Sequence, residues 1–241
     1  MHAPDVLDSL AFYRALGFTE VDTSDIWDHK YAVVTDGDIS IGLHEHGLDA
    51  PNLTFVQPDL AGHARNMSDS GYDFSRMRID EDVFNEIAFS DRDGHTVRMV
   101  EARTSLRAAE PPEDSLCGRW LELSLPVRDA MHAAIFWAPL APAILSHREE
   151  PTPHMRFDAG GLALALSESI ALKRPSLCFK CADREPIERA IEQHGIRHEK
   201  FPGYEGAFVM LRAPEGTELY VFDEDFLGES IEVIEGTDEV S

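Results

Sequence analysis

The stretch Val6–Phe18, VLDSLAFYRALGF, decides the fold, because its apolar residues repeat with the spacing of a helix. Leu10, Tyr13 and Leu16 recur at three-residue intervals on one face. Gly17 favours the end of a helix, and the segment from Phe18 to Val21 begins a predicted strand. A helix that packs on a following strand is therefore the first unit of the chain.

The same order of elements recurs along the chain. We predict four repeats, each made of one strand, one helix and three further strands. The predicted helices begin at Val6, Leu60, Ala130 and Glu185. The opening strands are predicted at Met1–Asp5, Leu53–Gln57, Trp120–Val127 and Ser176–Cys181. The first of these is shorter than an ordinary strand, so the first repeat is expected to lack most of its opening strand.

Ser9, Phe12, Tyr13, Leu16 and Gly17-Phe18 resemble the first helix of the vicinal oxygen chelate superfamily. That group includes glyoxalase I, bleomycin-resistance proteins, fosfomycin-resistance enzymes and type I extradiol dioxygenases. The resemblance implies an α+β protein in which four βαβββ repeats form two glyoxalase-like half-barrel domains. We place the first domain at 1–103, a linker at 104–118, the second domain at 119–225 and an acidic tail at 226–241.

Composition limits the possible partners. The formal net charge of −24 argues against nucleic-acid binding, which needs a basic face. Such an acidic chain fits solubility, high external salt or a cationic ligand. The 3 cysteines do not make a disulfide framework, and neither a signal peptide nor a membrane-length apolar run is present. These features predict a cytoplasmic protein that binds no membrane.

Alternation along the strands separates side chains that pack on helices from side chains that face the concave side of the sheet. In the second half, Leu121, Leu123 and Leu125 pack on helices, so their neighbours face inward. The residues predicted to face inward are Gly42, His44, His46, Asn52, Thr54, Thr96, Arg98, Glu122, Ser124, Ser176, Cys178, Lys180, Tyr220 and Phe222. Cys178 and Cys181, three positions apart in one strand, point to opposite faces, which argues against a redox or zinc pair.

In metal-dependent members of the superfamily, a His commonly opens a repeat and a Glu closes one. The resemblance places Asn52, Glu122 and Ser176 at opening positions and Arg98 and Tyr220 at closing positions. We therefore expect no bound metal, because the usual ligand types are missing. A divalent Fe, Mn, Ni or Zn ion is the alternative. His44 and His46 share one strand face and could chelate such an ion, or they are two histidines at the rim.

Without a metal, the inward polar residues are the candidate site. Glu122 and Tyr220 could act as a catalytic acid/base pair, or they form a structural hydrogen bond. Arg98 could hold a carboxylate or phosphate, or it pairs with a carboxylate such as Glu86. Asn52, Thr54 and Lys180 complete the predicted ligand-binding set.

Three functions remain open. The first is a metal-free, bleomycin-resistance-like protein that binds a small cationic or aromatic molecule. The second is a lyase, isomerase or dioxygenase that uses a metal or acid/base chemistry. The third is a scaffold without a small-molecule function. Whether the chain is an enzyme stays undecided, and the open sheet edge of the first repeat makes a homodimer an expectation.

Overall fold

The computed structural model describes residues 1–22, 29–46, 52–80, 85–101, 115–141, 143–149, 152–169, 171–201 and 206–224. Most of the predicted linker 104–118 and all of the predicted tail 226–241 lie outside these residues. The domain limits therefore stay predictions. None of the helices in the described part of the chain is long and apolar enough to cross a membrane.

Four repeats of the predicted order are present. The first two contain α1 (Val6–Ala15), β1 (Thr19–Val21), β2 (Tyr31–Thr35), β3 (Ser40–His44), β4 (Asn52–Val56), α2 (Leu60–Asp69), β5 (Phe74–Arg78), β6 (Glu86–Ser90) and β7 (Thr96–Val100). The last two contain β8 (Arg119–Pro126), α3 (Ala130–Trp137), β9 (Ala143–Arg148), β10 (His154–Asp158), β11 (Ala163–Ser167), β12 (Ser176–Cys181), α4 (Glu185–His194), β13 (His198–Glu199), β14 (Phe208–Arg212) and β15 (Glu218–Asp223).

Each complete repeat pairs its opening strand in parallel with its closing strand, as β4 pairs with β7, β8 with β11 and β12 with β15. In the first repeat this pairing is reduced to a single parallel bridge between His2 and His44. The prediction that the first repeat lacks most of its opening strand is therefore confirmed. The physical reason is that Asp5 already caps α1, since its side chain accepts hydrogen bonds from the backbone of Leu7 and Asp8.

The last two repeats share one sheet, because β8 pairs antiparallel with β12 and joins them into the order β13-β14-β15-β12-β8-β11-β10-β9. Gly118 allows this approach: its φ is +81°, and a side chain there would collide with the carbonyl oxygen of Lys180. The first two repeats form a separate three-stranded sheet, β1-β2-β3, and a four-stranded sheet, β4-β7-β6-β5.

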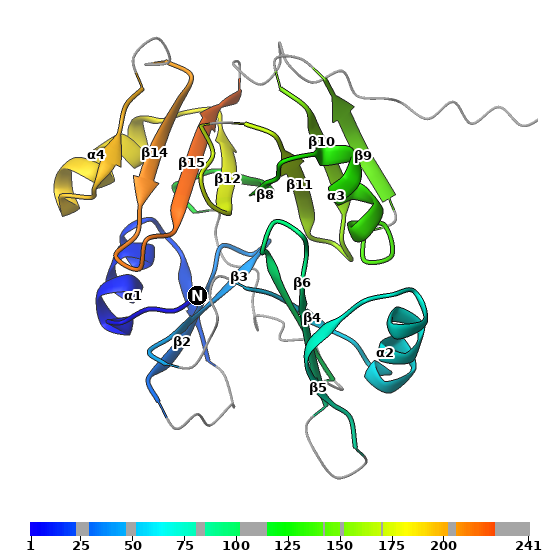
Figure 1. Cartoon of the computed structure of the whole chain (residues 1–241). Coiled ribbons are helices and arrows are strands. Elements are labelled where there is room, and N and C mark those ends of the chain that lie inside the picture. Colours follow the sequence, from blue (N-terminus) through cyan, green and yellow to red (C-terminus); the bar gives the residue numbers. More distant parts are fainter. Residues whose placement is uncertain are drawn as a thin grey trace, which may run out of the picture.

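Figure 1 shows α4 above α1 at one side of the molecule and α3 above α2 at the other, with the strands between them. The first repeat therefore lies beside the fourth, and the second beside the third. The buried apolar residues form one core that continues across both halves. Phe18 of the first repeat, for example, meets Phe179 of the fourth edge-to-face at 6.1 Å between ring centres.

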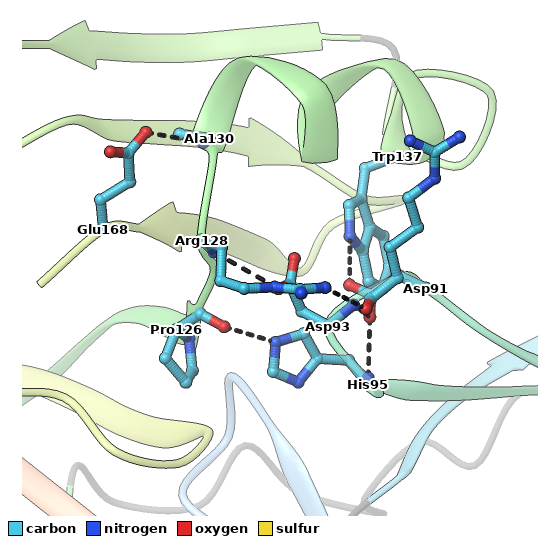
Figure 2. Close-up of polar contacts among 9 residues, drawn as sticks. Asp91, Asp93, His95, Pro126, Arg128, Ala130, Trp137 and Glu168 are labelled. Carbon is cyan, nitrogen blue, oxygen red and sulfur yellow. Dashed lines mark hydrogen bonds and ion pairs between the residues drawn. The ribbon is translucent and has the colours of Figure 1, made fainter. Parts of the chain in front are cut away.

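Hydrogen bonds at the hairpin between β6 and β7 join the second repeat to the third (Figure 2). The Trp137 indole donates to Asp91 at 3.2 Å, and Arg128 Nε donates to Asp93 at 2.7 Å. His95 Nε2 lies 2.8 Å from the carbonyl oxygen of Pro126, so the imidazole donates there. Because Trp137 is fully buried in α3, this hairpin fixes the helix of the neighbouring half.

The hairpin between β14 and β15 makes the equivalent contact with α1. Glu215 in this turn accepts hydrogen bonds from Ser9 Oγ and Tyr13 Oη, both at 2.7 Å. Tyr13 has no exposed surface, and burial together with the Glu215 carboxylate raises its pKa well above the usual value of 10. The phenol therefore stays protonated and remains a donor.

Candidate functional site

The face of the eight-stranded sheet that points away from the helices carries the polar residues of the second half. We call it the inner face and define it by six residues that alternate with buried apolar ones: Glu122, Ser124, Ser176, Cys178, Glu218 and Tyr220. On the other face Leu123, Phe179 and Val221 belong to the apolar core. The alternation read from the sequence therefore separates the faces as predicted.

The register of β12 sets which inner-face residues are neighbours. Glu122, Cys178 and Tyr220 form one row across β8, β12 and β15. Ser124, Ser176 and Glu218 form the next row. The resemblance groups the opening positions Glu122 and Ser176 with the closing position Tyr220. In the structure, the residue that lies between Glu122 and Tyr220 is Cys178. Ser176 and Cys178 differ by two positions in the register of β12. Alternation alone cannot distinguish them, because both side chains lie on the same face of the sheet.

Glu122 lies at the centre of a buried polar cluster. Arg156 Nε of β10 is 2.8 Å from Glu122 Oε2, at an ion-pair distance, although its N–H does not point along the line to that oxygen. His154 Nε2, on the same strand, is 3.3 Å from Glu122 Oε1. Arg156 also donates through Nη2 to the carbonyl oxygen of Leu121 at 2.8 Å. These contacts hold the carboxylate between two side chains of β10.

Burial changes the protonation of this cluster. It raises the pKa of Glu122 from 4.5 to about 7, and the nearby charges of Arg156 and Arg148 limit the rise. Burial, followed by the same two arginines, lowers the pKa of His154 from 6.5 to about 4. His154 is therefore neutral at pH 7, and its contact with Glu122 is not an ion pair.

Tyr220 lies in a different environment from Glu122. Its hydroxyl is 3.5 Å from Glu218 Oε2, and burial, then the Glu218 charge, raises its pKa to about 12. Its ring contacts Phe208 and Phe222, with centres 5.7 and 6.2 Å away. No hydrogen bond joins Tyr220 to Glu122 within the described residues. The two members of the predicted acid/base pair therefore lie in one row of the sheet but contact different side chains. Lys180, also predicted as a ligand residue, lies 3.6 Å from Glu224.

The predicted residues of the first half form a second polar group. Arg98 Nε is 2.8 Å from Glu86 Oε1, which confirms the alternative that Arg98 pairs with this carboxylate. Thr54, and not Asn52, is the parallel neighbour of Arg98. Thr54 Oγ1 donates to the side-chain oxygen of Asn52 at 3.1 Å.

His44 and His46 differ strongly in their surroundings. His44 is buried on β3, and its Nδ1 lies 3.1 Å from Nε2 of His29. Burial, followed by the N-terminal amino group and then His29, lowers the pKa of His44 to about 4. His46 is exposed. Within the described ranges no group of three or more His, Cys, Asp or Glu side chains is arranged to hold a metal ion.

The inner-face row does not fit a divalent metal. A metal beside Glu122 would lie next to the Arg156 guanidinium, whose positive charge already compensates the carboxylate. Metal ligands must be deprotonated, but burial raises the thiol pKa of Cys178 well above 9 and the hydroxyl pKa of Tyr220 to about 12. This donor set argues against metal chemistry here, and the absence of a bound metal stays a prediction.

Sequence reasoning missed the residues of β9 and β10 that surround Glu122. Arg156 and His154 alternate with the buried apolar residues Met155 and Phe157, so the same rule would have placed them on the inner face. The structure places His154 at the start of β10, against Glu122.

Comparison with known proteins places this arrangement in a known fold. A catechol 2,3-dioxygenase superposes with a TM-score of 0.57 at 16% identity, over 90% of this chain and 83% of its own. The 2,3-dioxygenase LapB of a Pseudomonas species gives 0.60 at 13% identity, over 92% and 89%. A variant of homoprotocatechuate 2,3-dioxygenase from Brevibacterium fuscum gives 0.60 at 15% identity, over 90% and 68%.

The chain has the fold of these dioxygenases. The resemblance of the first helix implies this α+β fold, so that prediction is confirmed, whereas the division into two domains stays a prediction. No protein-family model matches the sequence, and no curated protein matches it either. At these identities the likeness shows the fold and leaves the chemistry of the site to its own residues.

Proposed function

We propose that this protein binds a small organic molecule on the inner face of its eight-stranded sheet, around Glu122, without a metal. One observation carries the proposal: the Arg156 guanidinium lies 2.8 Å from the Glu122 carboxylate and supplies the positive charge at that position. Partly exposed rings, among them Tyr220 and Phe222 of β15, lie on the same face and offer apolar contact. Charged and aromatic side chains together suit an organic ligand.

Elemental analysis of the purified protein tests the metal-free part. We expect well below one equivalent of Fe, Mn, Ni or Zn per chain, because the row Glu122–Cys178–Tyr220 presents one compensated carboxylate and two protonated groups. About one equivalent of bound metal would contradict the proposal. Glu122→Gln then distinguishes the inner face from other metal sites, since a metal held there would be lost.

A thermal-shift screen against small organic ions and aromatic metabolites tests the binding part. A ligand that binds only the folded protein raises the midpoint of unfolding. We expect a shift that Glu122→Gln or Tyr220→Phe changes and that Glu185→Gln, on the exposed surface of α4, leaves unchanged. A shift that survives both inner-face changes would place the ligand elsewhere, and no shift with any compound would favour a scaffold.

A dioxygenase is the second candidate, favoured by the fold that this chain shares with 2,3-dioxygenases over about 90% of its length. Oxygen uptake with a catechol, after incubation with Fe(II) or Mn(II), measures it directly. Uptake that depends on the added metal would support this candidate over the metal-free one. The inner-face residues supply no fitting ligand set, so we expect no uptake above that of metal in buffer.

A further inference from the structure

Arg148 is a charged residue beside the buried polar cluster of Glu122, Arg156 and His154, and none of the contacts described above involves it. It lies at the end of β9, directly opposite His154 of β10, and it contributes to the electrostatic environment of both His154 and Glu122. Its Nε is buried and has no hydrogen-bond partner. Across the described parts of the chain, no hydrogen bond or ion pair joins the Arg148 guanidinium to another side chain.

The carboxylates of Glu149 and Glu168, which belong to the described residues, have other partners. Glu149, the next residue, is 2.7 Å from His147, and Glu168 accepts a hydrogen bond from the backbone of Ala130 at 2.8 Å (Figure 2). Glu122 is in contact with Arg156. Two guanidinium groups therefore face one carboxylate, and His154 is neutral at pH 7. The cluster has an excess of one positive charge when Glu122 is ionised and of two when it is protonated.

We propose that Arg148, beside the Glu122–Arg156 pair, binds the carboxylate group of a monoanionic organic ligand. The inference rests on the proposed function, because it names the ligand class of that same face. A buried guanidinium donor without a partner is costly, and a planar carboxylate matches its fork of N–H groups in two parallel hydrogen bonds. A carboxylate would thus satisfy the donor and neutralise the excess charge in one step.

The small residues beneath the cluster support this geometry. Ala165 of β11 lies between Arg156 of β10 and Ser124 of β8 in the register of the sheet, and it is fully buried. Its methyl group lets the Arg156 side chain cross β11 and reach Glu122 and Leu121. Arg156 thus contacts residues of β8, whereas Arg148 lies beside the Glu122–Arg156 pair and its guanidinium can bind a ligand.

This local charge is opposite to that of the whole chain. The net charge of −24 favours a cationic ligand when the protein is considered as a whole. Surface charges beyond about 8–10 Å are largely screened at physiological salt, whereas charges inside a buried cluster are screened much less. The net charge of the cluster, rather than the net charge of the whole chain, therefore determines the charge of the ligand that binds there.

Calorimetric titration of the full chain with benzoate, benzamide and benzylammonium tests the inference, since the three probes share a ring and differ in charge. We expect benzoate to bind most tightly, and Arg148→Gln to weaken it by roughly tenfold or more, as loss of a charge-assisted contact does. Arg189→Gln, which removes the same charge from the exposed surface of α4, should change benzoate affinity less than about twofold.

Each other outcome overturns the inference. Equal or tighter binding of benzamide or benzylammonium, with sensitivity to Glu122→Gln, would refute the anionic ligand and leave the proposed function intact. Benzoate binding that Arg148→Gln does not weaken would refute the role of Arg148. Failure of all three probes would refute the inference, and the wider thermal-shift screen with the elemental analysis then decides the proposed function separately. Unchanged urea midpoints of both variants confirm that they are folded.

Discussion

Replacing Glu215 by alanine should destabilise the whole protein, although Glu215 lies in a turn at the surface of the sheet. Its carboxylate accepts hydrogen bonds from Ser9 and Tyr13, which lie more than 200 residues earlier in the sequence. Both donors are buried, with 1% and 0% of their surface exposed. Glu215→Ala leaves two buried hydroxyl groups of α1 without this acceptor and removes a link between the first and fourth repeats.

The magnitude follows from the two bonds. A hydrogen bond to a charged group contributes about 1.5–3 kcal/mol, so two bonds have an upper range of roughly 3–6 kcal/mol. Because Glu215 is half-buried and water can reach part of the turn, we take the low end, about 3 kcal/mol. For a chain of this size that loss corresponds to a fall of roughly 6–12 °C in the melting temperature.

Urea unfolding of Glu215→Ala, Tyr13→Phe and the double variant measures the effect. We expect the two single losses to be non-additive, with a coupling of about 1–2 kcal/mol, because the changes remove one shared bond. Glu185→Ala is the matched control, since its pair with Arg189 is largely exposed and should contribute less than about 1 kcal/mol. A Glu215→Ala loss no larger than that control, or strictly additive losses, would refute the reasoning.

Three further predictions concern the protonation of Glu122, the protonation of His154 and the Arg98 pair. Because the pKa of Glu122 is raised to about 7 in the folded protein, stability is lost as the pH rises from about 4.5 to 7, and Glu122→Gln should remove this loss of about 3 kcal/mol. The lowered pKa of His154, about 4, has the opposite sign, so stability is lost as the pH falls from 6.5 toward 4, and His154→Gln should remove that loss. Urea midpoints between pH 4.5 and 7.5 check both, and parallel curves for the two variants and the wild type would contradict them. Arg98→Ala should cost about 2 kcal/mol, because among the described residues it leaves buried Glu86 with Arg76 alone, at 3.5 Å. Arg76→Ala should cost less than about 1 kcal/mol, and equal urea midpoints would count against this ranking.

The local elements of this protein could be predicted from its sequence. The helices predicted to begin at Val6, Leu60, Ala130 and Glu185 begin there, and the strand Ser176–Cys181 has the predicted bounds. Helix and strand periods depend on neighbours a few residues apart, and the ends depend on residues such as Gly195, which adopts a φ of +62°. The contact between Arg98 and Glu86 could also be predicted, because neighbouring strands of one repeat bring such residues together.

Only the tertiary structure decided which inner-face residues form the site. Alternation assigns Ser176 and Cys178 to the same face, and only the pairing of β8 with β12 shows that Cys178 is the neighbour of Glu122. The contact of Arg156 with Glu122 crosses β11, and that of Glu215 with Tyr13 joins the first repeat to the fourth. Such contacts depend on the register and packing of segments far apart in the chain, which short-range propensities do not determine.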